Sequence, residues 1–162
     1  MTEKVDLKLK INGRDHAIRV EPRKTLVDAI REDCGQTGTH IGCEHGICGA
    51  CSVMLDGEPV RSCLMFAVQA DGHKVTTVEG LTNADGTPGI LQDSFCEKHA
   101  LQCGYCTSGM LIAAHALLQT VKRPTDEQIR EAIGGNLCRC TGYQQIVDAV
   151  KHAAARLGEK GR

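Results

Sequence analysis

Alternating hydrophobic and polar residues predict that the first half of the chain is rich in strands. Residues 4–20 alternate on both sides of Asn12-Gly13, a strong signal for a tight hairpin turn. A second hairpin is expected over residues 51–63, turning at Asp56-Gly57, and a last strand near residues 74–78. Between the hairpins, Thr25 can cap a short helix over residues 26–33. That helix has three apolar residues on one face: Leu26, Ala29 and Ile30.

Helical periodicity replaces this alternation after a turn-forming linker over residues 81–88. Thr87-Pro88 is expected to start a helix that runs to about His99, since proline suits the first helical position. The next segment, residues 109–120, is apolar nearly all round and is expected to be a buried central helix. Thr107 or Ser108 is the expected cap of this helix.

Two further helices complete the predicted second half. Thr125 and Gln128 fit a capping box for residues 126–133, which end at Gly134-Gly135. The last helix is expected from Tyr143 to Ala155, followed by a frayed tail, with these residues on its apolar face: Ile146, Val147, Val150 and Ala154. The predicted fold is therefore α+β. A β-grasp arrangement occupies residues 1–79 and a four-helix bundle occupies residues 80–162.

Composition adds a constraint to this fold. Of the 162 residues, 41 % are hydrophobic but only 2 % are aromatic, so aliphatic packing needs a supplement, and ten cysteines can provide it. The sequence shows no secretory signal and no run long enough to cross a membrane, so we expect a cytoplasmic protein without membrane insertion. In that reducing compartment, clustered cysteines bind metal. A net charge of −1 argues against a nucleic-acid partner.

The first cysteine set lies in the segment GCEHGICGAC, residues 42–51. Its spacing, C-x4-C-x2-C with a later fourth cysteine, is that of plant-type ferredoxins, which hold a [2Fe–2S] cluster. The candidate ligands are Cys43, Cys48, Cys51 and Cys63. Gly42, Gly46 and Gly49 allow the loop to wrap tightly and point backbone N–H groups at the cluster. The first half is thus predicted to be a ferredoxin-like domain.

The second cysteine set lies in the helical half, and its two pairs each precede a predicted helix. The positive end of a helix dipole favours the negative charge of an iron–sulfur cluster, so two such helix starts can form one site. The candidate ligands are Cys103, Cys106, Cys138 and Cys140. We expect this site to be the more buried of the two because its flanking helix is so apolar. Tyr105 and Leu137 are expected to help exclude water from it.

Three other kinds of metal or redox site could use some of these residues. Structural zinc also takes four thiolates, so the second set alone leaves it open, although the upstream ferredoxin loop disfavours it. A thioredoxin-like CxxC requires a βαβ setting, whereas this half is helical. A Rieske site using His45 and His99 would draw on both halves and leave three cysteines of the first set unused. His45 is therefore interpreted as a solvated loop residue and His99 as a helix-end residue.

Two cysteines remain after both sets are assigned. Free cysteines usually behave as small hydrophobic residues. Cys34 and Cys96 are therefore predicted to pack rather than to bind metal.

Four segments together resemble the small iron–sulfur subunit of the molybdenum hydroxylases, the xanthine dehydrogenase and aldehyde oxidase family. They are GTHIGCEHGICGACSV, RSC, LQCGYCTSGM and GGNLCRCTGYQQIV. The resemblance spans nearly the whole chain and is closest to the three-subunit bacterial enzymes, such as aerobic carbon monoxide dehydrogenase. It departs from the common family pattern mildly, with Ser52 in GACSV for threonine and Ser108 in CTSG for proline.

The resemblance implies two [2Fe–2S] clusters bound by the eight cysteines named above. It also implies a large partner subunit with a molybdopterin cofactor and a medium partner with FAD. The implied assembly is a heterohexamer, (LMS)2, of two large, two medium and two small subunits. Gln102 matches a glutamine that touches the pterin, and Cys140 lies on the side that faces it. Electrons would pass from molybdenum through the helical-domain cluster and the ferredoxin-type cluster to FAD.

The expected function is therefore electron transfer within a molybdenum-containing hydroxylase, with substrate chemistry on another chain. A carbon monoxide dehydrogenase is a more specific alternative, and an organic substrate hydroxylated with water is favoured over it. A free-standing two-cluster ferredoxin and a zinc-stabilised binding module are the rivals from other classes.

Overall fold

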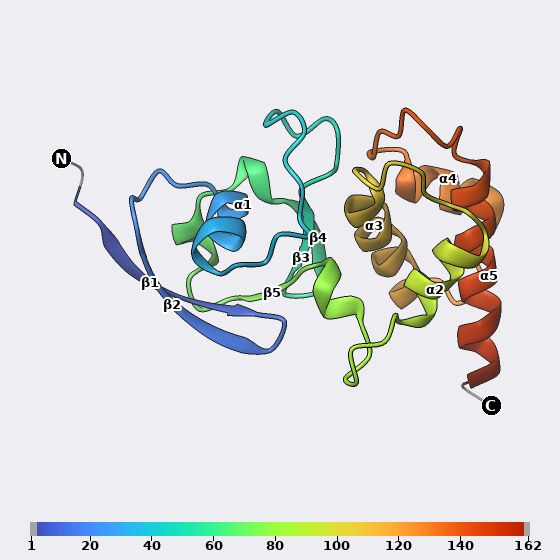
Figure 1. Ribbon diagram of the computed structural model, residues 1–162, viewed down its shortest axis with the longest axis horizontal. Coiled ribbons are helices and arrows are strands. Elements are labelled where there is room, and N and C mark those ends of the chain that lie inside the picture. Colours follow the sequence, from blue (N-terminus) through green and yellow to red (C-terminus); the bar gives the residue numbers. More distant parts are fainter. Residues whose placement is uncertain (1–2, 161–162) are drawn as a thin grey trace.

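Five strands form one mixed sheet in the computed structural model, which describes residues 3–160. The strands are β1 (Val5–Ile11), β2 (Arg14–Val20), β3 (Ser52–Leu55), β4 (Glu58–Arg61) and β5 (Lys74–Thr76). Their order in the sheet is β2-β1-β5-β3-β4. β5 joins the two antiparallel hairpins, because it runs parallel to β1 and antiparallel to β3 (Figure 1).

Both hairpin turns lie where the sequence predicts them. Asn12 and Gly13 have φ of 51° and 81°, and Asp56 and Gly57 have φ of 49° and 95°. Two consecutive residues with positive φ give the turn whose twist matches that of the paired strands. The predicted last strand is shorter than expected and ends at Thr76, since Val78 turns away to pack against the helical core.

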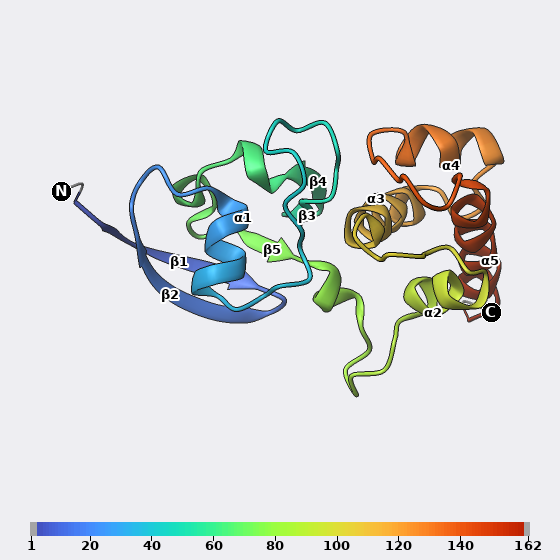
Figure 2. The same ribbon diagram turned by 45° about the horizontal axis from the view of Figure 1, so that its top comes forward.

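One short helix covers the sheet (Figure 2). α1 (Leu26–Asp28) continues as a wider helical turn over Ala29–Asp33. Thr25 caps it as predicted, because its hydroxyl oxygen accepts a hydrogen bond from the Asp28 N–H at 3.2 Å. Apolar residues of this helix and of the strands form the core of the first half, among them Leu9, Ile11, Leu26, Ile30 and Val75.

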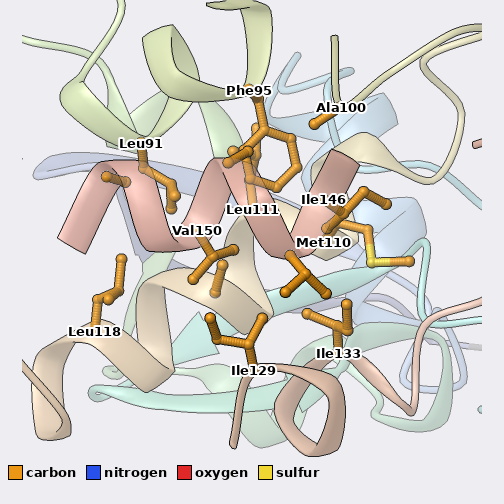
Figure 3. Packing of buried hydrophobic residues seen from close by; sticks show 14 of the residues in the cluster. Leu91, Phe95, Ala100, Met110, Leu111, Leu118, Ile129, Ile133, Ile146 and Val150 are labelled. Atoms are coloured by element: carbon orange, nitrogen blue, oxygen red, sulfur yellow. The ribbon is translucent and has the colours of Figure 1, made fainter. Parts of the chain in front are cut away.

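Four helices form the second half, as predicted. They are α2 (Ile90–Glu97), α3 (Thr107–Thr120), α4 (Asp126–Ile133) and α5 (Gln144–Lys160). Figure 3 shows their shared core, in which Phe95 from α2 and Met110 from α3 meet Ile129 from α4 and Ile146 from α5. α3 is the buried central helix, with eight buried residues from Ser108 to Leu118. The two halves thus have separate hydrophobic cores.

The starts of three helices differ from the prediction. α2 begins at Ile90 rather than at Thr87-Pro88, because the Gln92 side chain accepts a hydrogen bond from the Gly89 N–H at 2.8 Å and fixes the helix start there. α3 follows Cys106 and has no side-chain cap, since Ser108 donates its hydroxyl to the Ala50 carbonyl instead. α5 begins one residue late, because Tyr143 has a φ of 71°.

The expected fraying of the tail is also wrong over most of its length. α5 continues to Lys160, because Arg156 forms ion pairs with Asp93 at 2.7 Å and Glu97 at 3.3 Å on α2. Residues 161–162 of the predicted tail lie outside the described part of the chain. The capping box of Thr125 and Gln128 is confirmed, with both reciprocal hydrogen bonds formed.

The two phenylalanines offer a matched test of the helical core. Phe95 is 1 % exposed and Phe66 is 50 % exposed. We expect Phe95→Ala to lower the free energy of unfolding by about 3–5 kcal/mol through the cavity it leaves, and Phe66→Ala by less than about 1 kcal/mol. Guanidinium unfolding followed by circular dichroism measures both. Equal losses in the two variants would contradict the assigned core.

Candidate metal centres

The first cysteine loop, residues 40–51, has no regular secondary structure and rises beside α3 (Figure 1). The N–H groups of Cys48 and His45 point at the Cys43 sulfur, at 3.3 and 3.4 Å. These N–H groups lower the pKa of the Cys43 thiol to about 6. The loop thus stabilises a thiolate, which is the form that binds metal.

The two other candidates of the first set lie deeper. Cys51 directly precedes β3, and Cys63 lies in a short helical turn after β4. Both are buried, and burial raises the pKa of the Cys63 thiol to about 11, with a further contribution from its hydrogen bond to Cys51. The side chain of Cys48 influences the pKa of the Cys43 thiol and that of Cys51 influences the pKa of the Cys63 thiol, so the four thiols lie as two neighbouring pairs.

The three glycines singled out in this loop serve two purposes. Gly46 and Gly49 have φ of 77° and 76°, a conformation that other residues rarely adopt. Gly42 lacks a positive φ but provides room, since a Cβ there would lie 2.9 Å from the Cys48 sulfur. A Cβ at Gly46 would lie 2.4 Å from the Leu64 side chain. All three are therefore needed for the shape of the loop.

The second set is assembled from the two loops that precede α3 and α5. The sulfurs of Cys103 and Cys140 lie 3.6 Å apart, and Cys138 is close enough to Cys106 to contribute to the pKa of the Cys106 thiol. Burial raises the pKa of the Cys106 thiol to about 12. Burial acts in the same direction on Cys138, but hydrogen bonds from Thr141 outweigh it and lower the pKa of that thiol.

Two residues of the second site were not predicted from the sequence. The Thr141 hydroxyl and N–H reach the Cys138 sulfur at 3.1 and 3.5 Å, and the Tyr143 hydroxyl accepts a hydrogen bond from the Cys138 N–H at 2.8 Å. The closeness of Thr141 and Tyr143 to the cysteine pair in CRCTGY is the signal that could have identified them. Residues this near a candidate ligand in sequence often support it.

The second set is less buried than the first, contrary to expectation. Cys103 and Cys140 are exposed, whereas Cys51 and Cys63 are buried. The apolar residues of α3 pack against the helical core, so they do not cover the loop in front of the helix. Leu137 is 54 % exposed.

Tyr105 does not shield the second set from water either, because its ring is 50 % exposed and turned toward the first loop. There it stacks on His40 with ring centroids 4.8 Å apart.

The remaining candidates divide between core and surface. Cys34 packs in the core of the first half as predicted, and burial raises the pKa of its thiol to about 11. Cys96 is exposed, which contradicts its predicted packing role, because Phe95 is the neighbour that faces the core. His45 lies exposed in the loop, His99 follows the end of α2 with a φ of 52°, and Gln102 lies exposed beside Cys103.

The donor sets suit two-iron clusters. In a [2Fe–2S] cluster each iron takes two thiolates, and each cysteine set provides two pairs. Among residues 3–160, no three histidine, cysteine or carboxylate side chains gather as the shell of a single metal ion. The hydroxyls of Thr107, which directly follows Cys106, and of Thr39, four residues before Cys43, are buried without a hydrogen-bond partner. No helix within residues 3–160 is both long and apolar enough to span a membrane.

A ferredoxin-like half joined to a helical half, each with four paired thiols, defines a two-cluster iron–sulfur protein. Two families match the chain: the 2Fe-2S iron-sulfur cluster binding domain over residues 9–82, and the [2Fe-2S] binding domain over residues 77–151. The chain has two [2Fe–2S] clusters.

Similar proteins with named functions show which kind of two-cluster iron–sulfur protein this is. The chain is 48 % identical over 159 residues to the nicotine 6-hydroxylase small subunit of Paenarthrobacter nicotinovorans, covering 98 % of this chain and 95 % of the relative. It is 51 % identical over 148 residues to caffeine dehydrogenase subunit gamma of Pseudomonas sp. (strain CBB1), covering 90 % of this chain and 88 % of the relative.

Solved structures of related oxidoreductases match the chain as well. A chain of quinoline 2-oxidoreductase from Pseudomonas putida 86 matches with a TM-score of 0.94 at 48 % identity, over 99 % of each chain. Aldehyde oxidoreductase from Desulfovibrio gigas matches with a TM-score of 0.89 at 38 % identity, over 96 % of this chain and 17 % of that longer one. The chain belongs to the family of small iron–sulfur subunits of the molybdenum hydroxylases. It transfers electrons, and the substrate site lies on another chain.

Thiol reactivity tests the electrostatics of the first loop. A thiolate forms above the pKa of its thiol, so in the metal-free chain the labelling of Cys43 by iodoacetamide should rise through about pH 6 and then level off. Cys63 and Cys106, with thiol pKa values of about 11 and about 12, should label slowly throughout this range. Peptide mass spectrometry after timed labelling measures each rate. Labelling of Cys63 ahead of Cys43 would refute the prediction.

Proposed function

We propose that the eight paired cysteines bind the two clusters. The ferredoxin-type cluster is held by Cys43, Cys48, Cys51 and Cys63, and the helical-domain cluster by Cys103, Cys106, Cys138 and Cys140. The observation that supports this assignment is the arrangement of each set as neighbouring thiols in pairs, of which Cys103 and Cys140 have sulfurs 3.6 Å apart, as two irons require. Gly42, Gly46 and Gly49 then supply the loop backbone around the first cluster. When bound, each cluster supplies a one-electron couple.

The chain is proposed to work between two larger partners in an (LMS)2 heterohexamer. A large subunit holds the molybdopterin-type molybdenum cofactor, and Gln102 contacts the pterin. This placement is supported by the exposure of Gln102, Cys103 and Cys140 on one loop surface. A medium subunit holds FAD and docks at the first loop, where Ile47 and Leu64 are 66 % and 61 % exposed.

Two organisational features belong to the same proposal. The chain divides into domains 1–79 and 80–162, which is supported by the separate cores of its two halves. The protein is placed in the cytoplasm, where reduced, clustered cysteines can take up metal.

The substrate class favoured for the whole complex is an N-heterocyclic aromatic compound, hydroxylated with oxygen from water. Nicotine, caffeine and quinoline are all N-heterocycles, and their enzymes supply relatives at 48–51 % identity, against 38 % for the aldehyde oxidoreductase. These relatives give no specific support to carbon monoxide. They also favour a subunit over a free-standing ferredoxin, because two of them are named as subunits.

Cysteine substitutions test the cluster assignment. The purified chain should contain about four iron and four sulfide per molecule, and Cys48→Ser should retain about half of each. The paramagnetic resonance signal of the first cluster should disappear while that of the second stays. Cys96→Ser is the control and should keep both signals, since Cys96 lies exposed on α2 away from either set. Retention of all iron in Cys48→Ser, or zinc in place of iron, would reject the assignment.

Purification of the native complex tests the partners and the substrate. An affinity tag on this chain should bring down two larger chains that contain molybdopterin and FAD. The complex should reduce an electron acceptor with nicotine- or quinoline-like heterocycles and should incorporate ¹⁸O from labelled water into the product. Recovery of this chain alone would support the free ferredoxin, and turnover of carbon monoxide or aldehydes in preference to heterocycles would overturn the substrate class.

A further inference from the structure

Hydrogen bonds join the two cysteine sets directly, loop to loop. The Leu137 N–H, next to Cys138, donates to the Cys48 carbonyl at 2.9 Å. The Asn136 side chain donates to the Gly49 carbonyl at 3.1 Å. Asn136 is 1 % exposed, so its amide is committed to this contact. One ligand loop of the helical half therefore holds the central segment of the first loop.

Arg61 strengthens this contact from the other side. It lies two residues before Cys63 and donates to the Gly135 carbonyl at 2.6 Å and to the Asn136 side-chain oxygen at 3.4 Å. Its other terminal nitrogen contacts the Ser52 hydroxyl, and this hydroxyl donates to the Gly49 carbonyl at 2.6 Å. Arg61 thus links residues that flank cysteines of both sets. A guanidinium can do this because it presents several donors in a fixed plane.

Two glycines allow the loops to come this close. A Cβ at Gly109 on α3 would lie 2.1 Å from the Gly49 carbonyl oxygen, and a Cβ at Gly49 would lie 2.7 Å from the Asn136 side chain. Because the first distance is to a backbone atom, any side chain at Gly109 would push the first loop away from α3. The junction is therefore packed as tightly as a protein core.

Tyr105 makes a second contact, at the other end of the first loop. It lies between Cys103 and Cys106, and its hydroxyl donates to the Ile41 carbonyl at 2.5 Å. The Tyr105 carbonyl lies 2.9 Å from the His40 ring nitrogen Nδ1, and the two rings stack. The first loop is thus held at both ends, each time by a segment that carries cysteines of the second set.

These contacts matter because they act directly at the two cysteine sets, whereas the packing of α3 against β3 and β4 joins the halves elsewhere. The two halves have separate cores, and a linker of turn-forming residues connects them (Figure 2). The rate of electron transfer falls steeply with the separation of donor and acceptor, so a small hinge movement would slow it. A site whose supporting contacts are rigid avoids this loss.

We propose that Arg61, Asn136 and Tyr105 are positioning residues that fix the distance and the connection between the two clusters. The inference rests on the assignment of the eight cysteines as ligands. None of the three residues touches iron by this proposal. Each acts by holding the ligand loop of one cluster against the ligand loop of the other.

The test uses the purified holoenzyme with the double variant Arg61→Met, Tyr105→Phe, which removes a tie at each end of the loop. We expect iron content and both paramagnetic resonance signals to be retained. The magnetic splitting between the two reduced clusters should change. The rate of electron transfer from the second cluster to the first, measured on rapidly frozen samples, should fall by roughly tenfold. Arg61→Lys, which keeps the charge but loses the planar set of donors, should give an intermediate rate.

Arg156→Met is the matched control, because its ion pairs with Asp93 and Glu97 lie within the helical half. It should leave the splitting and the transfer rate unchanged. Retained iron with unchanged splitting and rate in the double variant would overturn the positioning role. If the double variant does not assemble, the magnetic splitting and the electron-transfer rate of Arg61→Lys test the positioning role instead. A wrong ligand assignment would be seen separately, as full iron content in Cys48→Ser.

Discussion

Sulfur that carries negative charge needs hydrogen-bond donors, and this requirement shapes both cysteine loops. Cys43 receives the N–H groups of Cys48 and His45, and Cys138 receives the hydroxyl and N–H of Thr141. Backbone donors can converge on one sulfur only if the chain turns sharply, which calls for a left-handed conformation. Glycines provide this conformation in the first loop, and Gly142 together with Tyr143 provides it in the second.

The aromatic residues are few, and three of the four have specific structural positions. Phe95 fills the centre of the helical core, where the other large side chains are aliphatic. Tyr143 closes the turn that presents Cys138, and Tyr105 ties the two loops together. The chain therefore uses hydroxyl-bearing rings where a loop has to be held from the side. Aliphatic packing, helix caps and ion pairs such as that of Arg156 stabilise the rest.

The two halves share a surface although they do not share a core. α3 packs against β3 and β4, and the first loop lies beside its beginning (Figure 1). This arrangement places one set of thiols at an exposed end of the helical half and the other at the edge of the sheet. This geometry suits the proposed function, because each cluster could lie near a different partner while the two stay close to each other.

Local patterns in the sequence determined most of the fold. The turns at Asn12-Gly13 and Asp56-Gly57, the cap at Thr25 and the four helices follow from side-chain periodicity and turn chemistry. The cysteine spacings likewise determined which thiols form a set. Only the tertiary structure decided which thiols are buried and how far α5 continues, because these depend on contacts between distant segments. The same reason explains why the roles of Arg61 and Asn136 were not predicted, since their partners lie more than seventy residues away in the chain.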